Sequence, residues 1–133
     1  MRNLVFGLVI WLGFGAAVQA QEADIQATIE AQLEAFQQDD FAAAFEFASP
    51  NLQRLFQTPK NFEQMVTRGY PMVWRPGSVR YLEMREQGGV FWQRVMITDQ
   101  SGRAHVLDYR MLETGDGWRI NGVQILDSSD LSA

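Results

Sequence analysis

The chain has 133 residues, a formal net charge of −5, 47% hydrophobic residues and no cysteine. This length favours a single domain, and the hydrophobic fraction excludes a chain that is disordered throughout. The lack of cysteine excludes disulfides and cysteine-based metal sites, and the acidic balance argues against a surface that binds nucleic acid.

Residues 1–20 have the pattern of a cleavable secretory signal peptide. Arg2 is the only charged residue in this segment, residues 4–14 form an apolar run, and Ala20 ends it with a small side chain. The run is shorter than the roughly 20 apolar residues of a membrane span. We expect cleavage between Ala20 and Gln21, a periplasmic or secreted location, and no membrane contact afterwards; the alternative is an uncleaved anchor.

The next segment predicts two helices. The first helix ends where Asp39 and Asp40 interrupt its apolar spacing, and either aspartate can cap the second, a short helix over residues 41–47. Before them, apolar residues recur at spacings of four, four and three, as on one helical face: Ile25, Ile29, Leu33 and Phe36.

Two further helix starts follow, because Ser49-Pro50 and Thr58-Pro59 each place a capping residue before a proline. The second of these helices should end at Gly69. Residues 69–78 hold two prolines and two glycines, which predicts an irregular loop, yet its apolar residues indicate that it packs against the core.

The second half predicts four strands, over residues 79–86, 90–98, 103–113 and 118–126. Links of two to four residues that contain glycine are typical of hairpins, so the strands should form an antiparallel meander. We expect one α+β domain over residues 21–127 and a frayed tail over residues 128–133. Its N-terminal helices should pack on the curved four-stranded sheet as a cone.

The faces of the sheet are predicted from alternation along each strand. In the third strand His105, Leu107, Tyr109 and Met111 share the face expected to meet the helices. The fourth strand changes face part-way, which either a bulge near Gly122 or two covered faces would explain. Two covered faces would imply a homodimer through the outer face of the sheet.

Six residues are candidates for a ligand site at the cone. An aromatic loop with one arginine could rim a pocket for an acidic or planar ligand, and further hydroxyls and the one histidine could line it. The alternatives are that the aromatic rings fill the core and that the arginine pairs with a surface acid. The candidates are Tyr70, Trp74, Arg75, Tyr81, His105 and Tyr109.

No catalytic residue is assigned from the sequence. His105 is the one candidate base, but Asp108 lies three positions on and should point to the opposite face. The chain has no spaced metal ligands, phosphate-binding loop or dinucleotide motif, so we expect no metal and no cofactor.

Five segments carry a resemblance to a known family: Ala-Gln-Leu-Glu-Ala-Phe (31–36), Phe-Ala-Ala-Ala-Phe (41–45), Arg68-Gly69-Tyr70, Val73-Trp74-Arg75-Pro76 and Gly117-Trp118-Arg119-Ile120. Together they resemble the bacterial family known as domain of unknown function 4864. The resemblance implies an exported protein with a cystatin-like or SnoaL-like cone, and it carries no activity and no functional residues. The Gly-Tyr and Trp-Arg-Pro segment is its most specific part.

Three hypotheses on function follow. The sequence favours an exported domain that binds a small ligand, hydrophobic or acidic, or a protein partner, without catalysis. The first alternative is a SnoaL-like enzyme on a small hydrophobic substrate, with His105 as base and Tyr109 or Tyr81 as proton donor. The second is a structural module that dimerises.

Overall fold

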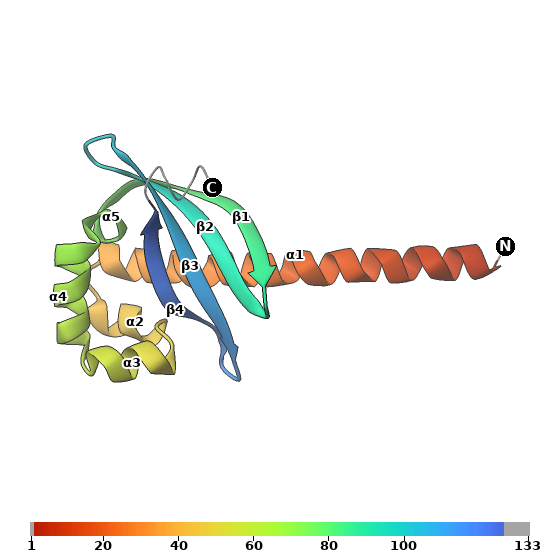
Figure 1. The fold of residues 1–133 in the computed structure, drawn as a ribbon, viewed down its shortest axis with the longest axis horizontal. Helices are drawn as coiled ribbons and strands as arrows, with labels where there is room; N and C mark the ends of the chain where they lie inside the picture. The colour runs from red at the N-terminus through yellow and green to blue at the C-terminus, as the bar shows by residue number, and fades with distance from the viewer. Residues whose placement is uncertain (1, 127–133) are drawn as a thin grey trace.

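The chain folds as a layer of helices on one antiparallel sheet (Figure 1). The computed structural model describes the backbone of residues 2–126 and the side chains of residues 15–126. The helices are α1 (Arg2–Gln37), α2 (Phe41–Glu46), α3 (Pro50–Phe56), α4 (Pro59–Gly69) and α5 (Pro71–Trp74). The strands are β1 (Pro76–Gln87), β2 (Val90–Asp99), β3 (Ala104–Thr114) and β4 (Gly117–Leu126). Their order, β1-β2-β3-β4 with antiparallel pairing, confirms the predicted α+β class and meander.

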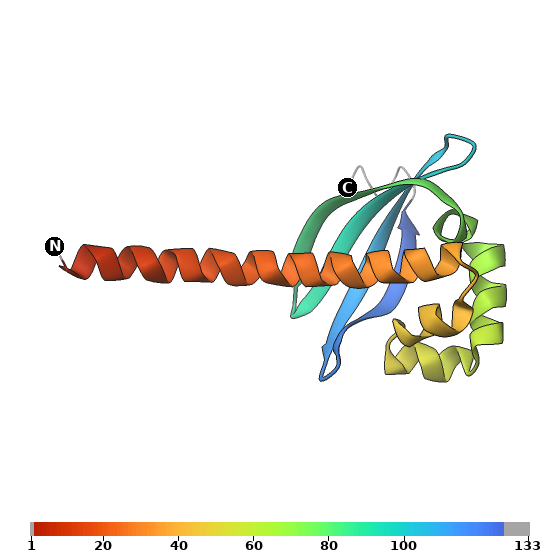
Figure 2. The same cartoon turned by 180° about the vertical axis from the view of Figure 1, so that it is seen from behind.

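Helix α1 crosses one face of the curved sheet, here called the inner face, and the shorter helices gather at one end (Figure 2). Its predicted apolar residues are all at most 3% exposed: Ile25, Ile29, Leu33 and Phe36. Burial of each such side chain contributes roughly 1.5–3 kcal/mol, so this stripe fixes the helix on the sheet. Within the described residues, no helix combines the length and apolarity needed to cross a membrane.

The starts of the short helices lie where the capping residues predict them. The side chains of Asp40, Ser49 and Thr58 each accept a hydrogen bond from the backbone N–H three residues on, at 3.1, 3.2 and 3.1 Å. Pro50 and Pro59 occupy the first turns of α3 and α4, where no backbone N–H is needed. These local signals set the sharp turns that fold α2, α3 and α4 over the end of the sheet.

The expectation of an irregular loop over residues 69–78 is wrong. Pro71 opens the one-turn helix α5, and Pro76 opens β1. Both are positions that tolerate proline, because a first helical turn and the first residue of an edge strand need no N–H donor from it. The predicted packing is confirmed, since Met72 and Val73 are 7% and 5% exposed.

A β-bulge in β4 explains the change of face in that strand. Arg110 pairs with Gly122, whereas the next residue, Met111, pairs with Ile120, so Asn121 is the extra residue. The bulge shifts the alternation of inner-facing and outer-facing side chains along β4 by one residue, as the bulge interpretation predicted. The inner face of β4 therefore receives Trp118, Ile120, Val123 and Ile125.

Phenylalanine rings fill much of the end of the cone beneath the short helices. Phe62 lies at the centre of this group, with ring centroids 5.8 Å from Phe36, 5.4 Å from Phe45 and 5.6 Å from Phe56. These separations are in the range of favourable aromatic pairs. The rings do not fill the cone completely, and the remaining space forms the candidate site.

Candidate functional site

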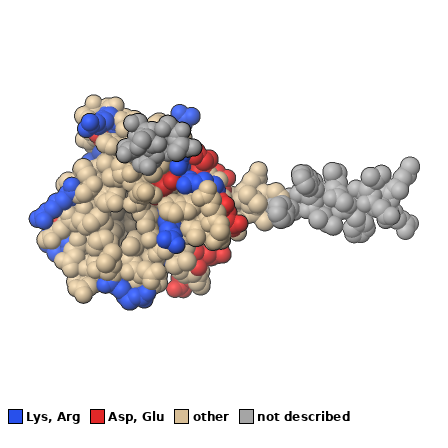
Figure 3. Space-filling model, viewed as in Figure 1, with Lys and Arg blue, Asp and Glu red and all other residues tan. Residues whose placement is uncertain are grey.

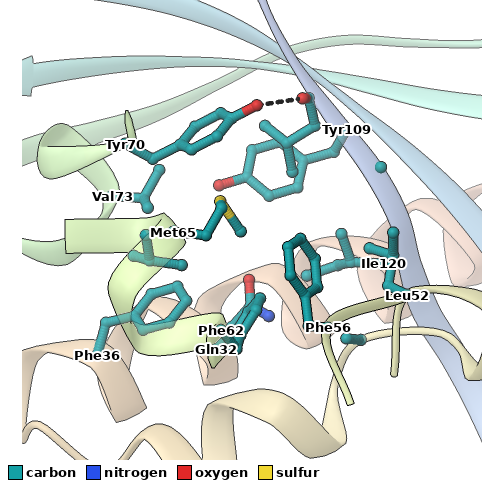
Figure 4. Close-up of a pocket in the computed structure, with 14 residues that line it drawn as sticks. Gln32, Phe36, Leu52, Phe56, Phe62, Met65, Tyr70, Val73, Tyr109 and Ile120 are labelled. Atoms are coloured by element: carbon teal, nitrogen blue, oxygen red, sulfur yellow. Dashed lines mark hydrogen bonds between the residues drawn. The ribbon is translucent and has the colours of Figure 1, made fainter. Parts of the chain in front are cut away.

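A cavity of about 290 Å³ lies between the helices and the inner face of β3 and β4 (Figure 4). The lining residues that are only half-buried come from α3, α4 and the bulge region of β4, which places the opening between these three elements. The cavity is lined by Gln32, Phe36, Ala48, Leu52, Phe56, Phe62, Met65, Val66, Tyr70, Val73, Tyr109, Ile120, Gly122 and Val123.

The wall of the cavity is mostly apolar and carries no charged side chain. None of its lining residues, all of them within the described part of the chain, is Asp, Glu, Lys, Arg or His. On the face shown in Figure 3, acidic residues gather where α1 leaves the sheet, and basic residues are scattered over both the helical end and the sheet. A ligand in this cavity would therefore meet no ionised side chain.

Tyr109 lies on the inner face of β3 and is 1% exposed. Its hydroxyl points into the cavity (Figure 4), and it has no hydrogen-bond partner among the described residues. Burial, and then the nearby Tyr81 and Tyr70, raise the pKa of Tyr109, so its hydroxyl stays protonated. The cavity thus holds a free, neutral hydroxyl that can donate one hydrogen bond.

Gln32 brings the second free polar atom. This residue of α1 is 4% exposed, and its Nε2 donates a 3.1 Å hydrogen bond to the carbonyl oxygen of Ala44. The side-chain oxygen Oε1 faces the cavity (Figure 4) and accepts no hydrogen bond from the described residues. Its position has a sequence signal that was missed: Gln32 lies three residues after Ile29 and four before Phe36, on the buried face of α1.

Tyr70 closes one side of the cavity. Its hydroxyl donates a 3.0 Å hydrogen bond to the carbonyl oxygen of Val123, on the inner face of β4 (Figure 4). The bond joins the end of α4 to the edge strand of the sheet. Of the six candidates predicted from the sequence, Tyr70 and Tyr109 lie at the cavity, and their role in binding stays a prediction.

Trp74 and Arg75 lie outside the cavity and bind Asp39 instead. The Trp74 Nε1–H donates to Asp39 at 2.8 Å, and Arg75 donates to both carboxylate oxygens at 2.9 and 3.0 Å. The guanidinium also stacks 4.5 Å over the Trp74 ring and donates to the carbonyl oxygen of Phe36 at 3.0 Å. Hydrogen bonds from Trp74 and then Arg75 lower the pKa of Asp39. Arg75 therefore pairs with a surface acid, the alternative that the sequence left open.

His105 and Tyr81 lie on the inner face but do not line the cavity. Tyr81 donates weakly to the Gln26 carbonyl oxygen at 3.4 Å and to Glu30 at 3.5 Å, and burial followed by Glu30 raises its pKa. The structure therefore places neither His105 nor Tyr81 in the cavity that Tyr109 lines.

A histidine–aspartate pair is present, although the sequence did not indicate one. His105 Nε2 lies 2.9 Å from an oxygen of Asp99, which the pairing of β2 with β3 places two residues beyond Ile97, the partner of His105. Hydrogen bonds from Ser101, then His105 and Arg103, lower the pKa of Asp99. As predicted, Asp108 points away from His105, to the outer face. The pair Asp99–His105 holds the end of the β2–β3 hairpin.

Residues 18–133 match the family described as Domain of unknown function (DUF4864). The chain belongs to this family. The match covers the helices that pack on the sheet and the whole sheet, so the cavity lies within the DUF4864 region.

No curated protein matches this DUF4864 chain. Among solved structures, a phospholipid-binding protein from Ralstonia solanacearum, determined with a bound phospholipid, is similar at a TM-score of 0.42. It is 20% identical, and the similarity covers 83% of this chain and 76% of that protein. The likeness is remote, and the phospholipid is a ligand of that protein.

Proposed function

We propose that this DUF4864 chain is an exported binding protein whose cavity takes a small, neutral and mostly apolar ligand without catalysing a reaction on it. The observation that carries the proposal is the cavity of about 290 Å³ with an uncharged wall. Ligand pockets are usually concave, mostly apolar and about 300–1,000 Å³, so this cavity suits a ligand at the small end of that range. A cavity of about 150 Å³ holds benzene, which makes a two-ring molecule a reasonable size for the site.

A hydrophobic ligand fits the site better than an acidic one. The acidic alternative depended on Arg75, whose guanidinium pairs with Asp39 outside the cavity. An anion in the cavity would lose its hydration and gain no cationic partner from the lining residues. An apolar molecule gains roughly 25 cal/mol for each Å² of surface that it removes from water.

The enzyme alternative finds less support. It requires His105 as base and Tyr109 or Tyr81 as proton donor around one substrate. Of these three side chains, Tyr109 alone lines the cavity, while His105 bonds to Asp99 at the hairpin. The geometry therefore favours binding over this form of catalysis.

Naphthalene, with two fused rings, is a suitable probe for the cavity, and calorimetry can measure its binding. We expect the wild-type chain to bind it and Val123→Phe to lose measurable binding, because the added ring enters the opening. Ile125→Phe is the matched control: Ile125 lies on the same strand and face, is 41% exposed and does not line the cavity. Absence of binding to the wild type by naphthalene and by its neutral derivatives naphthol and methoxynaphthalene, or equal loss in both variants, would overturn the proposal.

Export forms part of the same proposal. The signal peptide predicted over residues 1–20 is compatible with the packing, because residues 15–20 are exposed and the buried face of α1 begins at Ile25. Side chains before Gly15 lie outside the described residues. We expect mass spectrometry of the protein recovered from a bacterial periplasm to show an N-terminus at Gln21. Ala20→Arg should block this processing, and a chain of full length in the wild type would contradict export by cleavage.

The predicted homodimer is a further proposal about the outer face of the sheet. Half-buried Trp92, Met96 and Val106 lie on that face, next to an exposed Leu112. A second copy of the chain would cover these side chains. Light scattering should then give the mass of a dimer at micromolar concentration, and Trp92→Glu should give a folded monomer; a monomeric wild type would exclude the dimer.

A further inference from the structure

The cavity presents two free polar atoms of complementary kind in an otherwise apolar wall. One is the hydroxyl of Tyr109, from β3, and the other is the side-chain oxygen of Gln32, from α1 (Figure 4). Both side chains are more than nine-tenths buried, at 1% and 4% exposure. Among the described residues no buried side-chain nitrogen or oxygen atom lacks a partner, so these two atoms are accessible from the cavity. A ligand that fills the cavity must pair with them or leave them unsatisfied.

The hydrogen bond of the Gln32 amide nitrogen fixes the side chain so that its acceptor atom, Oε1, faces the cavity. Its amide nitrogen donates to the carbonyl oxygen of Ala44 at 3.1 Å. Rotating the amide by half a turn would place Oε1 against that carbonyl oxygen, acceptor against acceptor, and would lose the bond. Oε1 is therefore the atom that a ligand meets, and it accepts a hydrogen bond and cannot donate one.

Tyr109 is free to donate. Tyr70, the other tyrosine of the cavity, has its hydroxyl proton engaged with the carbonyl oxygen of Val123. The Tyr109 hydroxyl has no such acceptor among the described residues, and its ring is held by packing on β3. A ligand atom with a lone pair could accept its proton.

We infer that Tyr109 and Gln32 select a ligand whose buried end carries a neutral hydroxyl group, an inference that rests on the proposed function of the cavity. A hydroxyl can accept a hydrogen bond from a donor such as the Tyr109 hydroxyl and can donate one to an acceptor such as Gln32 Oε1. An ionised carboxylate would face Oε1 without a proton to donate, and an ammonium would find no carboxylate in the wall. A pure hydrocarbon would leave both protein atoms unpaired.

Four naphthalene compounds separate these contributions: naphthalene, naphthol, methoxynaphthalene and naphthoate, with each substituent at the same ring position. Methoxynaphthalene can accept from Tyr109 but cannot donate to Gln32. By calorimetry we expect naphthol to bind the wild-type chain roughly two- to ten-fold more tightly than methoxynaphthalene, and naphthoate to bind worst of the four.

Three variants assign the effect to the two side chains. Tyr109→Phe should reduce the advantage of naphthol over naphthalene by roughly two- to ten-fold. Gln32→Met should remove the difference in affinity between naphthol and methoxynaphthalene. In this variant the carbonyl oxygen of Ala44 still accepts a hydrogen bond from the backbone N–H of Phe47, at 3.2 Å. Tyr81→Phe is the control, because this inner-face tyrosine does not line the cavity and should change none of the four affinities.

The outcomes distinguish this inference from the proposal beneath it. If naphthalene binds and naphthol gains nothing, or if naphthoate binds best, the selection of a hydroxyl is overturned while the binding function stands. If none of the four compounds binds, the proposed function fails, and the inference fails with it.

Discussion

The hydroxyl of Tyr70 donates a 3.0 Å hydrogen bond to the backbone carbonyl oxygen of Val123. Tyr70 directly follows the last residue of α4, and Val123 is the second residue after the bulge of β4, so the bond links the helical layer to the edge of the sheet. Both residues line the cavity. The bond therefore ties two lining residues from the helical layer and the sheet to each other.

Tyr70→Phe tests this link. The variant keeps the ring and loses the hydroxyl, so we expect a decrease of about 1 kcal/mol in the free energy of unfolding, measured in urea. Hydrogen exchange should become faster near Val123, because the edge strand loses an anchor. Tyr81→Phe, which loses weaker bonds at 3.4 and 3.5 Å, is the control. Unchanged exchange at β4 would show that packing alone holds the opening.

The fold was predictable because its signals are local. The spacing of Ile25, Ile29 and Leu33 marks the buried face of α1 without knowledge of any partner. Ser49 caps the helix next to it in the sequence, and glycines in short links mark the hairpins. The mistake over residues 69–78 has a local cause as well, since proline breaks a regular element in its interior and also starts one.

The site was only partly predictable, because its contacts join distant residues. Asp39 binds Trp74 and Arg75 across a separation of 35 residues or more, and no sequence pattern indicates which acid an arginine will reach. A cavity is also the space that large side chains leave empty, which depends on how all of them pack. Gln32 was within reach of the sequence, since a polar residue on the buried face of a helix needs a partner.

Gln93 has a buried structural role in β2. It is fully buried on the inner face, and its Nε2 donates to the carbonyl oxygen of Leu82 at 3.0 Å, in the bulge of β1. Its Oε1 accepts from Gln26 at 3.3 Å, which joins the bulge to α1. We expect Gln93→Leu to lower the free energy of unfolding by about 1–3 kcal/mol, because the bulge carbonyl loses its donor. Chemical denaturation measures this, and a change below about 0.5 kcal/mol would mean that water replaces the amide.

Ser49 connects the start of α3 with the bulge of β4. Its hydroxyl accepts from the N–H of Leu52 at 3.2 Å and donates to Asn121 Oδ1 at 2.6 Å, and the residue is fully buried. Loss of a helix cap costs about 1 kcal/mol, and the unpaired Asn121 oxygen adds to this. We expect Ser49→Ala to lower the melting temperature more than Thr58→Ala, which removes a cap at an exposed position. Equal shifts would show that the bond to Asn121 contributes nothing.

Asp108 makes the stability of the outer face depend on pH. Its carboxylate is 4% exposed and receives paired hydrogen bonds from Arg85, at 2.8 and 3.2 Å, and from Arg94, both at 3.1 Å. Burial opposes its ionisation, but the bonds from Arg85 and then Arg94 outweigh burial and hold the pKa of Asp108 below its usual 3.8. A carboxyl whose pKa is lower in the folded chain stabilises that chain fully at neutral pH.

This contribution should decrease as the pH falls below about 5 and be absent once the pH is below the pKa in the folded chain. We expect the free energy of unfolding of Asp108→Asn to be about 1.5–3 kcal/mol lower than that of the wild type at neutral pH. The variant should also lose less stability than the wild type on acidification. Urea unfolding across the acid range measures both. A residual slope should remain, because hydrogen bonds also lower the pKa of Asp39 and Asp99. Asp116 is an exposed turn residue, so Asp116→Asn controls for the loss of one charge. If the free energy of unfolding fell in parallel for Asp108→Asn and the wild type as the pH is lowered, the arginine pairs would not govern acid stability.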